Sequence, residues 1–495
     1  MNDKIAGKFR GTGIKAGLMY GMAEFYGGGA FVIINTFFLV FLTKALGIPA
    51  ALAGAIPMVG KVWDAVTDPV MGNITDRTVS RFGAKRLYIL VGGVVSAISF
   101  VMLWTTIPSG NTTMLFIYYI VMYCLFSTGF TIIMVPYNGL LPDMIDSYTV
   151  RAKFSSIRMI WSTIGAIAAG MIPTLLIKDT LNTGMYLKVA ILFGFMFGFS
   201  AIVTFAGTWE KLKNPVRTRL ADSFSEAASV FKSRSFRIFI GIYLSGQCAM
   251  DFVSGMAIYY VDEVLNGYGS GYLIMLMGVL MVSQLLGMLV FTPIMTRTSK
   301  RTTILIGAPI RIVSTLGLLA FSYEGAPIIP ILALAAGIGI GNAATLTSIF
   351  ADMADVDELI TSTSRPGIVS GMATFARKIS AGLSVWIIGI LLSLVGYDAK
   401  LAQSGVRQAL FTQRGIAMIF IIIPVVLVAF LLLFGYIFPI TNKEFTVVKQ
   451  DIARRRGEDD SVATDEEKRI LERATGFAYE DLWKKSNEHR IHNHK

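Results

Sequence analysis

Two aspartates stand four residues apart in the stretch Trp63–Arg86, which reads "WDAVTDPVMGNITDRTVSRFGAKR". This spacing places Asp64 and Asp68 on one face of a helix. Adjacent carboxylates repel each other, so such a pair is suited to gaining and losing a proton or to binding a metal ion. The alternative is that both acids lie near a helix end and pair with nearby bases, namely Lys61, Arg77 or Arg81.

The composition indicates the environment of these acids. The chain is 54% hydrophobic and only 15% charged, with a mean hydropathy of +0.63, which is far more apolar than a soluble domain of this length. The sequence therefore predicts an all-α polytopic membrane protein. A membrane span needs roughly 20 apolar residues, and about twelve segments of that length are present. They lie near residues 18–42, 50–71, 87–106, 114–140, 155–177, 185–209, 236–261, 272–295, 303–323, 326–350, 367–396 and 414–438.

Lysine and arginine are concentrated in alternate loops, on the side of the membrane that holds the N-terminus. Because cytoplasmic loops carry the excess of basic residues, both termini are predicted to be cytoplasmic. The first apolar segment is too long for the apolar part of a signal peptide, so we expect it to be retained. The formal net charge of +12 is then mainly a topology signal, and no nucleic-acid partner is expected. The predicted location is the cell membrane.

A basic segment separates six predicted spans from six others. The expected organisation is an N-terminal six-helix bundle (1–209), a cytoplasmic central loop (210–235), a C-terminal six-helix bundle (236–438) and a cytoplasmic tail (439–495). A partial repeat supports this division, since "TDRTVSRFGAKR" after the second span has a weak counterpart, "TRTSKRT", after the eighth. Such a layout is typical of transporters that bind substrate near the membrane midplane, between the two halves.

Several ionisable residues fall within the predicted spans. An ionisable side chain at the bilayer centre costs about 2.5–3.5 kcal/mol on insertion scales, so it normally faces a cavity or a partner. These residues are Glu24, Asp64, Asp68, Arg158, Asp251, Arg311 and Lys378. Asp251 and Gln247 lie one turn apart in the seventh span, where they either contribute to a site from the second half or form a polar packing pair.

Separated motifs, in order along the chain, resemble one family. They are "YGMAEFYGGGAF", "WDAVTDPVMGNITDRTVSRFGAKR", "TIIMVPYNGLLPDM", "RAKFSSIRMIWS", "ADMADVDE" and "MATFARKISAG". They resemble the glycoside–pentoside–hexuronide:cation symporters, the melibiose permease-like family of the major facilitator superfamily. The resemblance covers approximately residues 10–438 and implies the fold of that superfamily, with two six-helix bundles.

The resemblance also implies roles for individual residues. Those matching the cation site of the family are Asp64, Asp68, Thr131, Lys378 and Thr374. Glu24 and Arg158 match an acid and an arginine that bind the sugar from opposite sides. A carboxylate and a guanidinium across a cleft can satisfy several sugar hydroxyls. Tyr137 could stack on the apolar face of a sugar ring, and Asn138 stands where melibiose permease has a tryptophan implicated in sugar binding.

The loop after the second span resembles a motif of the superfamily that latches the inward-closed state through charge pairs. Its residues here are Gly72, Asp76, Arg77, Arg81 and Gly83. The glycines permit tight turns. The alternative is that the basic residues only set the topology.

The chain departs from melibiose permease at three positions, because Met134 replaces an aspartate, Asn138 the tryptophan and Phe130 a tyrosine. Melibiose is therefore a poor candidate substrate. Asp64 and Asp68 with Lys378 give a local charge of −1, which one monovalent cation neutralises. Met134 offers a soft thioether where a further carboxylate would attract a metal ion, so a proton is favoured over sodium as the coupling ion.

The sequence thus predicts a secondary symporter for a glycoside, pentoside or related sugar, which needs no cofactor beyond its coupling ion and works as a monomer in the bilayer. Two alternatives stay open. One is a carrier of amphiphiles such as lysolipids, which would need a lateral apolar opening. The other is a transporter-like membrane sensor, with 439–495 as its output segment. No ATP-binding or nucleophile motif indicates an enzyme.

Overall fold

The computed structural model describes residues 13–78, 80–108, 110–145, 148–210, 228–267, 271–344 and 349–483. Within these ranges the regular structure is entirely helical, which confirms the predicted fold class. The first group of helices is α2 (Ile14–Gly21), α3 (Ala23–Ile33) with the π-helical turns η1 (Ile34–Phe38) and η2 (Phe41–Ala45), α4 (Ala50–Arg77), α5 (Ala84–Leu103), α6 (Thr112–Met144), α7 (Tyr148–Leu176) and α8 (Thr183–Gly207). The second group is α10 (Arg234–Tyr259) with η4 (Tyr260–Val264), α11 (Tyr272–Arg297), α12 (Lys300–Gly317) with η6 (Leu318–Phe321), α13 (Ile328–Ala343), α15 (Pro366–Leu394) and α17 (Leu410–Ile437).

Ten helices among the described residues are long and apolar enough to cross a membrane. Two helices of the bundles differ from this pattern for physical reasons. α4 is 28 residues long but carries Lys61, Asp64 and Asp68 in its length. α13 has only 16 residues and ends at Ala343, whereas the sequence predicted a span to residue 350; residues 345–348 lie outside the described part.

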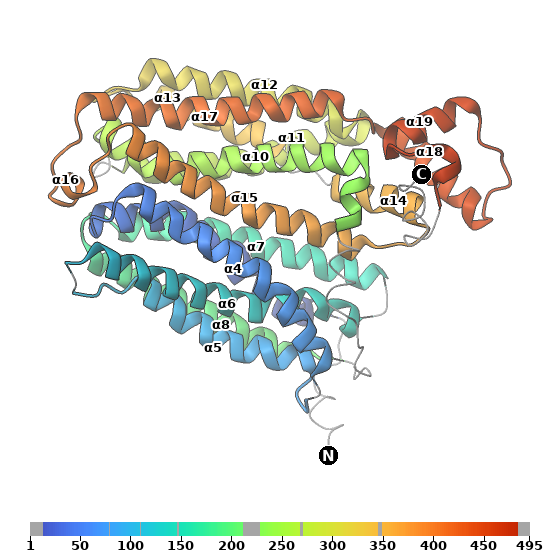
Figure 1. The fold of residues 1–495 in the computed structure, drawn as a ribbon, viewed down its shortest axis with the longest axis horizontal. Coiled ribbons are helices and arrows are strands. Elements are labelled where there is room, and N and C mark those ends of the chain that lie inside the picture. The colour runs from blue at the N-terminus through green and yellow to red at the C-terminus, as the bar shows by residue number, and fades with distance from the viewer. Residues whose placement is uncertain are drawn as a thin grey trace, which may run out of the picture.

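The two groups of helices form two bundles that lie side by side (Figure 1). In the first bundle α3 packs on α7, and α5 packs on α6 and α8. In the second, α10 packs on α17 and α15, and α13 on α11 and α12. The bundles meet where α4 lies along α15 and where α7 contacts α11. Short α16 (Ala399–Gln403) lies at one end of the bundles, and α14 (Ile349–Thr361), α18 (Asn442–Arg456) and α19 (Asp465–Thr475) lie at the other (Figure 1).

Small residues bring α4 and α15 into close contact. A Cβ atom added at Gly389 would lie 2.3 Å from the carbonyl oxygen of Ala50, and one added at Gly54 would lie 2.8 Å from that of Val385. Glycines allow two backbones to approach in this way because they carry no side chain. This contact fixes the acidic face of α4 beside α15, which belongs to the other bundle.

The tail folds back onto the second bundle. Leu471 of α19 is fully buried, in one apolar cluster with Leu359 of α14 and Phe236 of α10. Arg456 of α18 pairs with Glu358 of α14, and the Trp483 N–H donates to the Leu359 carbonyl (2.9 Å). Part of the tail thus forms the helix α19, and this helix is docked on the second bundle.

We predict that Leu471→Asp releases the tail. An uncompensated buried charge costs about 3–5 kcal/mol, which exceeds what the neighbouring surface ion pairs contribute. Limited trypsin digestion of the full-length protein should then cleave within 439–483 much faster than in the wild type. Val462→Asp is the matched control, because Val462 is 85% exposed. Equal cleavage rates in the wild type and the Leu471→Asp variant would contradict the docked position.

Candidate functional site

The acids of α4 lie in a small polar cluster between the bundles. Asp64 is fully buried, and its Oδ2 accepts a hydrogen bond from Lys61 Nζ at 3.2 Å, one turn earlier on the same helix. The Lys61 ammonium also lies 3.4 Å from the centre of the Phe31 ring, a favourable cation–π position. Asp68, one turn further along α4, has a side chain that is 28% exposed.

Helix α6 supplies a hydroxyl to each acid. The Ser127 hydroxyl donates to Asp64 Oδ1, and the Thr131 hydroxyl donates to Asp68 Oδ1 at 2.7 Å. Ser127 and Thr131 are four residues apart, as Asp64 and Asp68 are. Each pair therefore lies on one face of its helix, and the hydroxyls of α6 can reach both acids of α4. The sequence prediction included Thr131 but missed Ser127.

The second bundle reaches this cluster through Lys378 of α15. Its Nζ lies 2.5 Å from Asp68 Oδ2 and 4.0 Å from Asp64 Oδ2. The structure thus brings Lys378 to both predicted acids and joins the two bundles there. Thr374, one turn away, is exposed and donates to the Ser370 carbonyl of its own helix (2.9 Å), so it is not drawn into these hydrogen bonds.

The electrostatics of the cluster differ from the sequence estimate in one respect. The sequence argument counted Lys378 alone beside two acids, but the structure adds the Lys61 ammonium, which makes the formal charge zero. Lys61 had been considered only as a pairing partner near a helix end. The (i, i+3) spacing of Lys61 and Asp64 indicated that the two side chains could pair. The spacing could not indicate that the pair is buried between the bundles.

The residues predicted to bind the substrate lie together within the first bundle. Arg158 of α7 pairs with Glu24 of α3 (Nη2 to Oε1, 3.1 Å) and donates to Asn138 Oδ1 of α6 (2.6 Å). Its guanidinium lies 4.9 Å from the centre of the Tyr137 ring, which in turn stacks on Tyr20. All four predicted substrate residues are therefore neighbours.

The packing of α3 on α7 sets the position of this group. A Cβ atom at Gly28 would lie 2.3 Å from the Ser162 carbonyl oxygen, so only glycine allows the helices to come so close. Glu24 Oε2 is buried and has no hydrogen-bond partner among the described residues. A buried carboxylate oxygen is costly to leave unsatisfied, which makes it an available acceptor for a ligand hydroxyl.

The loop after α4 makes its described contacts inside the first bundle. Gly83 has a positive φ of 94°, and its neighbour Lys85 donates through its backbone N–H to Glu210 Oε2 (2.9 Å). Burial raises the pKa of Glu210, against the opposing effect of that N–H. Arg81 stacks on the adjacent Phe82 ring, 4.6 Å from its centre. The remaining predicted latch residues are Gly72 within α4 and Arg77 at its end, and Asp76, whose side chain lies outside the described part.

A second charged contact joins the bundles near α16. Lys44 of η2 is buried and donates to Glu263 Oε1 of η4 (2.6 Å), and it also pairs with Asp262. The hydroxyls of Thr43 and Tyr259 are hydrogen-bonded across the same contact (2.6 Å). The first span was predicted to end near residue 42, so Lys44 fell outside it.

Two features of the second bundle were also missed or left open. Asp251 of α10 receives two hydrogen bonds, each 2.7 Å long, from Arg377 of α15. Arg311 of α12 is 1% exposed and donates to Asn342 Oδ1 (2.8 Å) and the Gly246 carbonyl (3.3 Å). Among the described residues no acid lies within ion-pair distance of Arg311.

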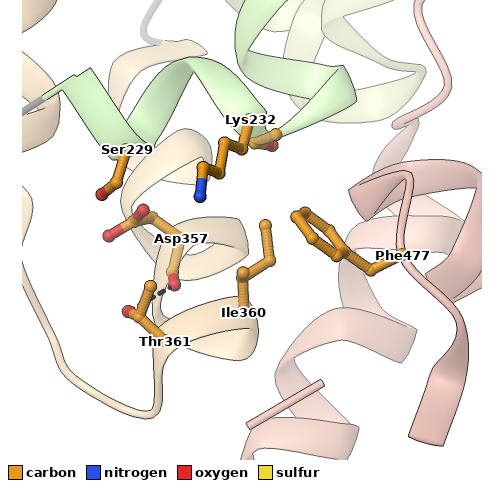
Figure 2. A pocket seen from close by; sticks show the side chains of 7 residues that line it. Ser229, Lys232, Asp357, Ile360, Thr361 and Phe477 are labelled. Atoms are coloured by element: carbon orange, nitrogen blue, oxygen red, sulfur yellow. Dashed lines mark hydrogen bonds between the residues drawn. The ribbon is translucent and has the colours of Figure 1, made fainter. Parts of the chain in front are cut away.

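A pocket is lined by residues of α14, of the segment before α10 and of the tail (Figure 2), and the acids of α4 are not among its lining residues. Figure 1 shows α14 at the end of the molecule that also holds α18 and α19. Figure 2 shows the Lys232 side chain above the pocket and the Phe477 ring of the tail at its right, with Asp357, Ile360 and Thr361 of α14 below Lys232. Asp357 is held by Arg365 in a bidentate pair (2.8 and 2.9 Å). The pocket thus belongs to the junction between the tail and the second bundle.

Comparison with known proteins agrees with this arrangement. The family described as "MFS/sugar transport protein" matches residues 19–442. Similar proteins include the isoprimeverose transporter of Lactiplantibacillus pentosus, 25% identical over 90% of this chain and 93% of the relative. Others are the glucuronide carrier protein homolog of Escherichia coli K12, 24% identical over 88% and 95%, and a putative sulfoquinovose importer of Salmonella typhimurium, 26% identical over 88% and 92%.

Solved structures show the same fold at low identity. The nucleoside transporter NupG aligns with a TM-score of 0.59 and 14% identity over 85% of this chain and 97% of its own. A bacterial homolog of the human lysosomal transporter Spinster, inward-facing and unoccupied, aligns with a TM-score of 0.61 and 14% identity over 87% and 97%. The relatives are membrane transporters and not enzymes. The chain therefore belongs to the MFS/sugar transport protein family, the glycoside–pentoside–hexuronide:cation symporter type of the major facilitator superfamily.

Proposed function

We propose that this protein takes up a glycoside, pentoside or related sugar together with a proton, by alternating access. One observation supports this most: Lys378 of the second bundle holds Asp64 and Asp68 of the first. An ion that binds these acids must change a contact between the bundles. A ligand shifts an equilibrium between two conformations only if it binds one of them more tightly. The ion should therefore have different affinities for the two arrangements of the bundles, and its binding shifts the balance between them.

The donor set favours a proton over sodium. Each of the four carboxylate oxygens already has a partner, from Ser127, Lys61, Thr131 and Lys378. Sodium would have to displace an ammonium group to gain oxygen ligands, whereas a proton needs only one carboxylate oxygen. Protonation of Asp68 removes the charge that attracts Lys378, so proton binding alone can loosen the contact between the bundles.

The sugar is assigned to the group around Glu24 and Arg158. Glu24 Oε2 can accept from a sugar hydroxyl, and the Tyr137 ring offers an aromatic surface beside the guanidinium. The Glu24–Arg158 ion pair, whose arginine also donates to Asn138 Oδ1, favours a polar substrate over an amphiphile. The relatives whose names mention a substrate are named for sugars or sugar derivatives, which agrees with this assignment.

We place both termini in the cytoplasm and the protein in the cell membrane, following the distribution of basic residues. The α16 end is then external, and the pairs of the buried Lys44 with Asp262 and Glu263 close the external side. Chain segments 1–209 and 236–438 act as the two moving bundles, with 439–495 as a cytoplasmic tail. Each chain contains both bundles, so a monomer suffices for transport.

Replacing Asp64 with asparagine should abolish uphill accumulation and leave some downhill exchange. The variant keeps the sugar group but loses the charge through which the ion acts. One charge moving through 100 mV supplies about 2.3 kcal/mol, which is roughly a 50-fold gradient at 1.36 kcal/mol per decade. Labelled sugar uptake in vesicles with imposed pH and sodium gradients measures this gradient.

Asp465→Asn is the control for the Asp64 variant, because the Asp465 side chain is 92% exposed. Full accumulation by Asp64→Asn would overturn the assignment of Asp64. Strong sodium stimulation that survives a protonophore in the wild type would replace the proton by sodium and leave the symporter intact.

Glu24→Gln and Arg158→Ala should each weaken sugar binding while the protein still folds. A hydrogen bond to a charged group contributes about 1.5–3 kcal/mol, so affinity should fall roughly 10- to 150-fold. Sugar binding to purified protein measures the affinity, and elution in size-exclusion chromatography checks folding. Unchanged affinity in both variants would move the sugar site elsewhere.

Lys61→Gln should strengthen the binding of the coupling ion. The glutamine amide still donates to Asp64, but one ammonium now faces two carboxylates, so the cluster gains a charge of −1. We expect the concentration of coupling ion at half-maximal uptake to fall about tenfold, which corresponds to roughly 1.4 kcal/mol. Lys188→Gln is the control, because Lys188 is exposed. A coupling-ion concentration at half-maximal uptake that is unchanged or higher in Lys61→Gln would count against the charge argument.

A further inference from the structure

The second bundle contains an acid–arginine pair that matches the one in the first. Glu24 and Arg158 lie on α3 and α7, which belong to the first and fifth transmembrane segments of their bundle; Asp251 and Arg377 lie on α10 and α15, the first and fifth of theirs. α7 and α15 are both 29 residues long, and their arginines stand within one position of each other along the helix. Because the two halves of such transporters are repeats, the two arginines occupy related places on the fifth segments of the two bundles.

The two pairs are also similarly accessible. The side chains of Arg158 and Glu24 are 25% and 15% exposed, and those of Arg377 and Asp251 are 22% and 8% exposed. A third pair in the second bundle, Arg365–Asp357, is only 6% and 4% exposed. The Arg377 side chain is therefore partly exposed, as the Arg158 side chain is.

Arg377 is adjacent in sequence to Lys378. Lys378 contacts the acids of the first bundle, while Arg377 contacts Asp251 within the second. A ligand that touches Arg377 would therefore act on the same turn of α15 that senses the ion. Gln247, partly buried and one turn before Asp251 on α10, adds an amide to this surface.

We infer that Asp251 and Arg377 form the second half of the substrate site and bind the end of the sugar that faces the second bundle. This inference rests on the proposed function. The two carboxylates accept from hydroxyls and the two guanidinium groups donate to them. The substrate class is a neutral glycoside with hydroxyl groups at both ends, since each arginine is balanced by its own acid and leaves no positive charge over for a sugar acid. Arg311 does not supply that charge, because it is enclosed within the second bundle.

The test uses full-length protein in proteoliposomes with imposed gradients. The probes are neutral disaccharides, including isoprimeverose, their monodeoxy analogues, and methyl glucuronide as an acidic sugar. The variants are Asp251→Asn, Arg377→Gln and the conservative Arg377→Lys, and Arg365→Gln is the control for loss of a buried arginine.

We expect the wild type to prefer a neutral disaccharide over methyl glucuronide. Asp251→Asn and Arg377→Gln should raise KM for that disaccharide tenfold or more, with a smaller effect on the maximal rate. One monodeoxy analogue should lack the hydroxyl that Arg377 binds, so its KM should be equal in the wild type and in Arg377→Gln. If Arg377 were only structural, its replacement would raise KM for every analogue. Arg377→Lys should fold, and its KM for the disaccharide should lie between those of the wild type and Arg377→Gln. Arg365→Gln should lower the protein yield without changing KM.

Three results would overturn this inference. They are a KM for the disaccharide unchanged in Asp251→Asn and Arg377→Gln, a loss of affinity equal for every analogue, and a wild-type preference for methyl glucuronide. Each of these leaves the proposed uptake of sugar standing. If the wild type accumulates none of the probes under either ion gradient, the proposed function fails and the inference fails with it.

Discussion

The ammonium group of Lys378, held between Asp64 and Asp68, is the interaction on which the rest of the site depends. A charge in the membrane is tolerated only where a partner compensates it, and here the partner lies on the other bundle. The same contact therefore stabilises the buried Asp64 and the partly exposed Asp68, and it fixes how the bundles meet. Any ion that changes the charge of the acids therefore changes the stability of the contact between the bundles.

The helix packing follows from this constraint. Gly54 and Gly389 let α4 and α15 approach closely, so that a lysine side chain can bridge between them. Ser127 and Thr131 of α6 and Lys61 of α4 supply the other hydrogen bonds to the acids. The two acid–arginine pairs stand apart from this cluster on α3 with α7 and on α10 with α15, and Lys378 and Arg377 connect the ion cluster to the second pair through one turn of helix.

Much of this could be predicted from the sequence, because apolar length and the position of charges are local properties. Asp64, Asp68, Glu24, Arg158 and Lys378 stood out as ionisable residues within apolar segments. The pairing of Arg377 with Asp251 did not, since the arginine lies next to the more conspicuous Lys378 and its partner is 126 residues away. The neutralising role of Lys61 and the docking of α19 onto α14 depend equally on tertiary contacts. The span predicted to end near residue 350 continues past α13, which ends at Ala343, into residues outside the described part, so its end stays a prediction.

The most direct measurement of coupled transport is the proton flux that the sugar itself evokes. Proteoliposomes loaded with a pH-sensitive dye, without sodium and with the membrane potential clamped at zero, receive a transported sugar on the outside only. We expect the lumen to acidify as the sugar enters, at a rate that follows the sugar concentration, and Asp64→Asn to show sugar exchange without acidification. Sugar entry into wild-type vesicles with no change in internal pH would contradict proton coupling at Asp64 and Asp68.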